Sequence, residues 1–231
     1  MALRLMRSTA RLSSQITYVT ENLRIKYEEP HSASMVLPNG VDIQMFRPEQ
    51  RKPSPFTVGF VGALRQWVDL KPVFEAVQHL NQAGTDVRVL VVGDEGGLMD
   101  TLVLATNKYR LGDKIECTGV VPFIKVPEYI NAMDVVVFPF TFDNPMPLAA
   151  LQAMACGKPI ISTRPLEINC GAIRYSPDAG SYRRRLEDLI AHPDVGQRMG
   201  AEGRSYVIQH HDWAKITERM ERIIESRRPH D

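Results

Sequence analysis

The chain of 231 residues contains few cysteines, no long apolar run and almost no net charge. Its three cysteines, Cys117, Cys156 and Cys170, cannot all pair, and none has the C-x-x-C spacing of a metal site, so we interpret them as reduced thiols of a cytoplasmic protein. The longest apolar runs, at Val87–Gly93 and Met133–Phe140, are far shorter than the ~20 residues that a membrane-spanning helix needs. A formal net charge of +1 gives no field that would attract nucleic acid. The sequence therefore predicts neither a membrane span nor a nucleic-acid-binding surface.

Apolar segments alternate with helical patterns through the middle of the chain. Short runs rich in valine and isoleucine predict strands at Phe56–Val61, Val87–Val92, Ile115–Cys117, Val135–Phe138 and Pro159–Ser162. Strands that are apolar on both faces are typical of a parallel sheet with helices on both sides. We therefore predict an α/β fold with a doubly wound, Rossmann-like parallel sheet, and a ligand site beyond the carboxyl ends of its strands.

Glycines and an apolar loop follow the first three of these strands. Gly62 and Gly93 end the first two, where a residue without a side chain lets the backbone come close to a ligand. After the third strand comes Gly119, followed by Val120 and Val121, which are suited to form apolar walls beside a nucleobase. None of these segments matches G-x-G-x-x-G, so a dinucleotide fingerprint is not predicted. Ordinary turns and loops are the alternative interpretation of all three.

The segment after the fourth strand carries the strongest signal. From Phe138 to Pro159 it reads FPFTFDNPMPLAALQAMACGKP. Its Asn-Pro-Met-Pro stretch predicts a helix that begins near Met146 and is capped by Asn144, because asparagine caps helices and proline suits their first turn. The N-terminus of this helix would face the carboxyl edge of the sheet, where its amides and dipole favour a diphosphate. We expect Asn144 to lie on the same edge as the three glycines.

This segment resembles the signature of the retaining family-four glycosyltransferases, P-S-x-x-E-G-F-P-L-x-x-L-E-A-M-A-C-G-x-P-V. The residues in agreement are Pro139, Pro147, Leu148, Leu151, Ala153, Met154, Ala155, Cys156, Gly157 and Pro159. The stretch VLPNGVD at Val36–Asp42 resembles the start of that family's C-terminal domain. The resemblance covers nearly the whole chain and implies the C-terminal, nucleotide-sugar-binding half of a GT-B fold.

The resemblance also divides the chain into three parts. Residues 1–30 would be the remnant of an N-terminal acceptor domain, namely its last strand and helix. Residues 31–208 would form the Rossmann-like nucleotide-sugar-binding domain, and residues 209–231 a C-terminal amphipathic helix. We expect the strand of the remnant, at Ile16–Val19, to find no sheet to join within this chain, because fewer than ~30 residues cannot bury a core of their own.

The final helix has an apolar face. Trp213, Ile216, Met220 and Ile223 recur at helical spacing, and Asp212 precedes them as the expected cap. We interpret this face as core packing rather than as a groove for a partner.

The resemblance implies a donor site built from backbone amides, a helix dipole and cations. The residues implied at this site are Gly62, Arg65 and Lys71 at the diphosphate, Val120 and Val121 at the base, Gln152 at the ribose, Asn144 at the sugar, and Gly93, Met146 and Leu148 beside them. For Arg65 and Lys71, solvated surface charges on an amphipathic helix are an equally good interpretation.

The chain departs from the family at both ends of its E-x7-E spacing, where Asn144 and Gln152 replace carboxylates. An amide keeps the hydrogen-bonding shape but cannot act as an anionic base. Asp143 lies one residue away and would substitute if the loop shifted. The family's arginine and lysine after the first glycine are also absent, since Ala63 and Val68 occupy their positions.

Two hypotheses from different classes follow for the function. The first is transfer of a hexose from a UDP- or GDP-linked sugar to an acceptor hydroxyl with retention, without any cofactor besides the donor, since the chain has no D-x-D cluster to bind a metal. The second is a non-catalytic nucleotide-sugar-binding or interaction module from a split or decayed glycosyltransferase. Besides the nucleotide sugar, the expected partner is a separate acceptor-binding domain or a second copy of the chain. We expect at most peripheral membrane contact, through Arg183–Arg185, where a solvated helix start is the alternative.

Overall fold

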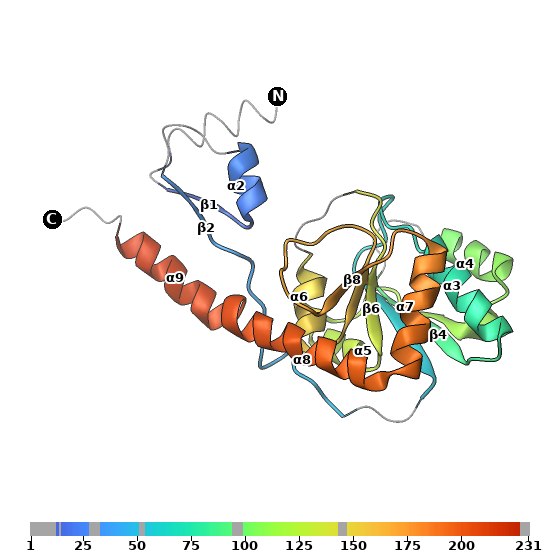
Figure 1. The fold of residues 1–231 in the computed structure, drawn as a ribbon. Helices are drawn as coiled ribbons and strands as arrows, with labels where there is room; N and C mark the ends of the chain where they lie inside the picture. Colours follow the sequence, from blue (N-terminus) through green and yellow to red (C-terminus); the bar gives the residue numbers. More distant parts are fainter. Residues whose placement is uncertain are drawn as a thin grey trace.

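A six-stranded parallel sheet forms the centre of the computed structural model, which describes residues 13, 15–27, 33–50, 54–93, 99–142 and 147–226. The strands lie in the order β5-β4-β3-β6-β7-β8 (Figure 1). Their bounds are β3 Phe56–Val61, β4 Val87–Val92, β5 Ile115–Cys117, β6 Val135–Phe138, β7 Ile160–Ser162 and β8 Ile173–Tyr175. The five expected strands are confirmed in one parallel sheet, and β8 adds a strand that the apolar pattern did not indicate.

Helices cover both faces of this sheet. The helices are α3 Lys71–Gln82, α4 Met99–Lys108, α5 Val126–Asn131, α6 Leu148–Ala155, α7 Ala179–Ala191, α8 Pro193–His210 and α9 Trp213–Glu225, with short 3-10 turns at Gly112–Lys114 and Phe123–Lys125. Side chains of α3, α4 and α7 pack on one face with Val58 and Val135, and those of α5 and α6 pack on the other with Leu90 and Val136. Because neighbouring residues of a strand point to opposite faces, the central strands are apolar on both sides, which confirms the doubly wound arrangement.

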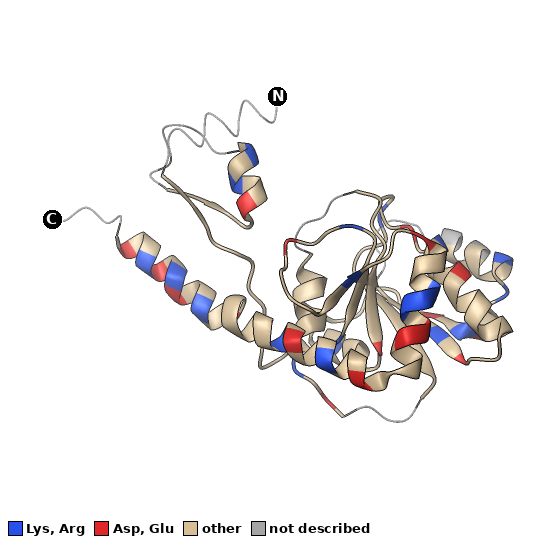
Figure 2. Ribbon diagram, viewed as in Figure 1, with Lys and Arg blue, Asp and Glu red and all other residues tan. Residues whose placement is uncertain are grey.

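Charged side chains of both signs are interspersed along α7, α8 and α9 (Figure 2). The basic cluster Arg183–Arg185 is exposed at the start of α7, and Nε of Arg183 lies 3.6 Å from Oε1 of Glu187. This pairing favours a solvated helix start over a site for lipid head groups. In the part of the chain that the structure describes, no helix combines the length and the apolar character needed to cross a bilayer.

A small unit precedes the main sheet. Strand β1 (Ile16–Tyr18) pairs in parallel with β2 (Ser34–Val36), and helix α2 (Glu21–Tyr27) lies between them in the chain. The expectation that β1 finds no sheet to join is wrong, because the chain returns after α2 and supplies β2 itself. The unit is thin, since α2 has no buried residue and Ile25 is 67% exposed. The division of the chain after residues 30 and 208 stays a prediction.

The linker after β2 is fixed to the junction between α8 and α9. The N–H of Val41 donates to the carbonyl of His211 (2.8 Å), and the N–H of Trp213 donates to the carbonyl of Val41 (3.1 Å). Nδ1 of the buried His211 lies 2.8 Å from the carbonyl oxygen of Asn39 and must carry the proton, because a carbonyl only accepts. Burial lowers the pKa of His211, which favours the neutral ring. A Cβ at Gly40 would overlap the Trp213 indole, so only glycine lets α9 begin against the linker.

Helix α9 has the expected cap but a largely exposed apolar face. The Asp212 carboxylate accepts the N–H of Ala214 at 3.1 Å, as predicted. Ile216 is 5% exposed, whereas Trp213 is 56% and Met220 is 47% exposed. The interpretation of this face as core packing is therefore wrong for most of its length. The reason is that α9 runs away from the main sheet (Figure 1). The helical spacing of apolar residues shows which side of a helix is apolar, but it does not show which part of the protein covers that side.

Two glycines of α8 give a matched test of its packing against α6. A Cβ at Gly200 would overlap the backbone carbonyl of Gly157, just beyond α6, whereas at Gly196 it would lie 3.5 Å from Leu189, an ordinary contact. We expect Gly200→Ala to lower the free energy of unfolding by about 1–3 kcal/mol, as overpacking does. Gly196→Ala should raise it by up to about 1 kcal/mol, because alanine favours the helix. Urea unfolding followed by circular dichroism measures both, and an unchanged or raised stability of Gly200→Ala would contradict this packing.

Candidate functional site

The ends of β3, β4 and β5 meet at one edge of the sheet. The N–H of Gly62 donates to the carbonyl of Val92 (3.0 Å), and the N–H of Gly93 donates to the carbonyl of Gly119 (3.0 Å). Gly93 has a φ of +107°, and a Cβ there would lie 2.5 Å from the carbonyl oxygen of Gly62. Only glycine fits this position. The structure thus confirms the three glycines side by side along the carboxyl edge.

Backbone hydrogen bonds join the loop after β3 to the loop after β6. The N–H of Asp69 donates to the carbonyl of Pro139 (2.8 Å), and the N–H of Thr141 donates to the carbonyl of Trp67 (2.9 Å). These bonds bring the loop that carries Arg65 alongside the segment that leads toward helix α6. The predicted site residues that lie outside the described residues are Asp143, Asn144 and Met146.

Helix α6 begins close to the position that the sequence predicted, near Met146. It begins at Leu148, and the extended Pro147 takes the N-cap position without a side-chain hydrogen bond, so the cap expected at Asn144 is wrong. Pro147 itself is extended, so the helix begins only at the residue that follows it. Leu148 is 52% exposed and Gln152 is half-buried, one turn apart, while Ala150, Leu151 and the last three residues of the helix are buried. Leu148 and Gln152 therefore share the less buried face of α6, and their roles in donor binding stay predictions.

Exposed cations border this edge. Arg65 lies in the loop after β3 and Lys71 is the first residue of α3. Arg164, which the sequence reasoning missed, lies just after β7, and its Nη2 donates to the carbonyl of Thr141 at 3.2 Å. The sequence could have indicated Arg164, because it lies two residues after the strand predicted at Pro159–Ser162. Such positions lie at the carboxyl edge of a parallel sheet. The roles of Arg65 and Lys71 at a diphosphate stay predictions.

The loop after β5 exposes apolar side chains next to the end of β4. Val120 is 69% exposed and Phe123 is 59% exposed, whereas the half-buried Val121 packs against the core. The Phe123 ring also meets Phe46 edge-on, with ring centroids 5.6 Å apart. Of the two valines predicted to line a base site, Val120 is the one whose side chain is exposed to solvent.

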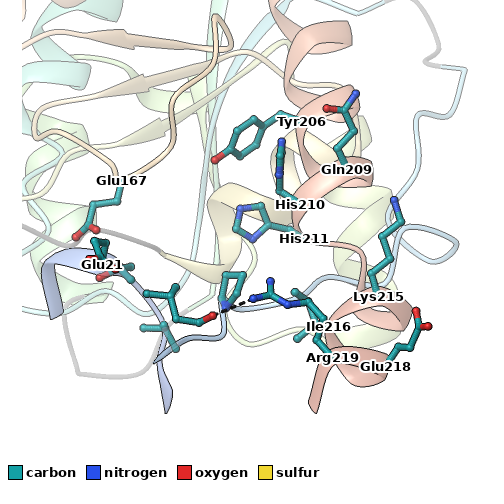
Figure 3. A pocket seen from close by; sticks show the side chains of 14 residues that line it. Glu21, Glu167, Tyr206, Gln209, His210, His211, Lys215, Ile216, Glu218 and Arg219 are labelled. Carbon is teal, nitrogen blue, oxygen red and sulfur yellow. Dashed lines mark hydrogen bonds between the residues drawn. The ribbon is translucent and has the colours of Figure 1, made fainter. Parts of the chain in front are cut away.

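A cavity of about 500 Å³ lies away from these residues, between the β1–β2 unit and the α8–α9 junction. Figure 3 shows the residues around it, among them Glu21, Glu167, Tyr206, His210 and His211. The ring centroid of Tyr206 lies 4.7 Å from that of His210 and 5.6 Å from that of His211. None of the predicted donor-binding residues lines this cavity. This cavity lies where the small unit contacts α9 and not at the strand ends. The strand ends therefore remain the candidate donor site.

Across the described ranges, no three histidine, cysteine, aspartate or glutamate side chains gather in a way that could hold a metal ion. Cys117, Cys156 and Cys170 form no disulfide bonds. Burial raises the pKa of Cys156 to about 12, so this thiol stays protonated and unreactive.

The family model described as glycosyl transferases group 1 matches residues 42–206. The chain belongs to this family. A D-inositol 3-phosphate glycosyltransferase from Segniliparus rotundus is 28% identical over 188 residues, which cover 73% of this chain and 41% of that protein. The group 1 chain thus spans less than half the length of this relative.

Two solved structures show the same fold. Anabaena HepE, crystallised with UDP and glucose, matches with a TM-score of 0.81 at 17% identity, over 97% of this chain and 66% of HepE. The C-terminal domain of LpcC, a glycosyl transferase group 1 family protein from Francisella tularensis, matches over its full length (100%) and 75% of this chain, with a TM-score of 0.63 at 19% identity. These matches confirm the C-terminal half of a GT-B fold that the sequence motifs implied.

Gln152 gives a direct test of the open face of α6. If its amide binds the ribose, Gln152→Leu leaves a buried hydroxyl without a partner and should weaken nucleotide binding by about 1–3 kcal/mol. Isothermal calorimetry with UDP and with GDP measures the change. The matched control is Gln197→Leu, at an exposed position of α8, which should leave the affinity unchanged. Equal affinity of both variants would remove Gln152 from the site.

Proposed function

We propose that this group 1 chain binds a UDP- or GDP-linked hexose and serves its transfer to an acceptor hydroxyl with retention at the anomeric carbon. The observation that carries the proposal is the carboxyl edge, where hydrogen bonds link the strand ends at Gly62, Gly93 and Gly119. Backbone amides, a helix N-terminus and cations at such an edge stabilise the charge that develops on a leaving diphosphate. The match to HepE, which was solved with UDP and glucose, supports the same kind of ligand.

In this proposal each part of the donor is bound by different residues, of which Asn144 lies outside the described part of the chain. Gly62, Arg65 and Lys71 bind the diphosphate, with Arg164 as a further cation at the same edge. Val120 contacts the base and Gln152 the ribose, while the sugar meets Asn144. No metal or other cofactor takes part besides the donor itself.

We further propose that the acceptor is bound by a separate domain or by a second copy of the chain. Apolar side chains on the small unit and on α9 support such a partner, since Ile25, Trp213, Met220 and Ile224 are 47–67% exposed. Exposed apolar groups gathered on one part of a protein are typical of an interface. Residues 1–30 and 209–231 would then belong to the acceptor-binding side, and residues 31–208 to the donor side.

A non-catalytic nucleotide-sugar-binding module is the second candidate. The amides at Asn144 and Gln152 favour it, because neither can act as an anionic base. For either function we place the protein in the cytoplasm, with at most peripheral membrane contact, which agrees with three cysteines that form no disulfide bond.

We expect the isolated chain to bind nucleotide sugar but to transfer the sugar very slowly. Holding donor and acceptor together supplies roughly 7–11 kcal/mol of a transfer barrier, and the proposal assigns the acceptor to another domain. The measurement is a radiolabelled transfer assay on the monodisperse chain, beside calorimetry with UDP-glucose and GDP-mannose. Robust multiple turnover with a simple acceptor would contradict this expectation, and no binding of either donor would contradict the proposed function itself.

Carboxylates introduced at positions 144 and 152 would distinguish the catalytic function from the non-catalytic one. In the presence of the acceptor-binding partner, Asn144→Glu combined with Gln152→Glu should raise the transfer rate if the site is catalytic. Gln197→Glu adds a carboxylate on α8, away from the strand ends, and is the matched control. A rate that stays at background in the double variant, with donor binding intact, would favour the non-catalytic module.

A further inference from the structure

Two exposed aromatic side chains stand at the carboxyl edge of the sheet. Trp67 in the loop after β3 is 43% exposed, and Phe142 in the loop after β6 is 45% exposed. Their ring centroids are 5.5 Å apart and their planes meet at 86°, an edge-to-face pair. We call these two residues the aromatic corner. Ligands of such folds bind at the carboxyl ends of the strands, so a half-exposed aromatic pair at this edge is well placed to contact one.

The protein holds the aromatic corner rigidly. The carbonyl of Trp67 accepts both the N–H (2.9 Å) and the hydroxyl (3.2 Å) of Thr141, the residue before Phe142. Phe142 also extends a row of rings from the core, with centroids 5.8 Å apart between Phe138 and Phe140 and 6.5 Å apart between Phe140 and Phe142. The rings of Phe138 and Phe140 are buried, so the half-exposed ring of Phe142 packs next to a fixed part of the core. A preorganised surface binds a ligand without the loss of side-chain freedom.

Two arginines lie near the aromatic corner, one by a hydrogen bond and one in the sequence. Arg164 donates to the carbonyl of Thr141 at 3.2 Å, and Arg65 lies two residues before Trp67. An aromatic surface with a polar rim matches one ligand chemistry well, that of a pyranose ring. Such a ring has an apolar C–H face, whose polarised hydrogens meet the negative face of an aromatic ring, and hydroxyls at its edge.

We propose that Trp67 and Phe142 form a stacking surface for a pyranose ring and position it at the carboxyl edge. This inference rests on the proposed function, because the pyranose belongs either to the donor or to the acceptor. Both sources present the same C–H face, and the experiment has one arm for each.

The first arm compares UDP with UDP-glucose by calorimetry. Trp67→Ala and Phe142→Ala should each weaken UDP-glucose binding by about three- to tenfold, the size of one aromatic contact, and leave UDP binding unchanged. Trp67→Phe keeps an aromatic face and should restore most of the affinity, which a merely structural role in the loop would not explain. Phe123→Ala removes a more exposed ring at the other end of the same edge and should leave the ratio of the two affinities unchanged.

The second arm uses Trp67 as its own reporter. The chain has two tryptophans, so Trp213→Phe leaves Trp67 as the one source of indole fluorescence. Glucose or maltose is titrated into this variant with UDP already bound, and Phe142→Ala is added to test the response. A saturable change in emission that Phe142→Ala abolishes, with an unchanged ratio of UDP-glucose to UDP affinity in the first arm, assigns the surface to the acceptor's pyranose.

The possible failures are distinct. If UDP and UDP-glucose bind the parent chain but neither arm responds to the substitutions, the stacking surface is refuted and the proposed function stands. If no UDP- or GDP-linked sugar binds the folded chain, the proposed function is refuted, and the stacking surface is refuted with it.

Discussion

The contact between Gly93 and the carbonyl of Gly62 governs the geometry of the candidate site. A Cβ at Gly93 would lie 2.5 Å from that oxygen, so any other residue would push the end of β4 away from the end of β3. The loop after β3 follows directly, and hydrogen bonds tie it to residues 139 and 141 of the loop after β6. A shift at the glycine contact would therefore move Arg65, Trp67 and the approach to α6 together. Two residues without side chains thus set the position of the charged and aromatic groups around them.

A second set of contacts fixes the small unit and α9, which lie outside the main sheet. The linker at Asn39–Val41 and the junction at His211–Trp213 are joined by three hydrogen bonds, and Gly40 lies beneath the Trp213 indole. Farther along α9, Nη2 of Arg219 donates to the carbonyl of Val36 at 3.1 Å (Figure 3). The small unit and α9 are consequently bound to each other as well as to the main domain. A partner that covered the exposed face of α9 would also contact or constrain the β1–β2 unit.

The sequence predicted the main sheet because its signal there is local and redundant. Strands such as Val87–Val92 are apolar on both faces, and only a sheet covered by two layers of helices satisfies that pattern. Where the outcome depended on distant chain segments, the prediction failed. The partner of β1 is a three-residue strand at Ser34–Val36, too short for a periodic pattern, and the face of α9 depends on what lies opposite it. The helix cap predicted at Asn144 is wrong, because the extended Pro147 takes the N-cap position of α6. The position of Arg164 was predictable only once β7 was accepted as a parallel strand.

The loss of two carboxylates at the candidate site affects donor binding and catalysis differently. Carboxylates at Asn144 and Gln152 would repel a diphosphate by about 3 kcal/mol per charge at ~5 Å and an effective dielectric constant of ~20. Amides remove that repulsion but also lose the charge-assisted hydrogen bonds to sugar and ribose hydroxyls, which are roughly twice as strong as neutral ones. The two effects oppose each other in donor affinity, so a chain with amides can retain its ligand. In turnover a helix dipole and cations do not replace the lost anionic groups, because they stabilise the leaving diphosphate and not the positive charge on the sugar. If Asn144 and Gln152 take the proposed roles, a group 1 site with exposed Arg65, Lys71 and Arg164 and with amides in place of carboxylates is better suited to hold a nucleotide sugar than to break its glycosidic bond unaided.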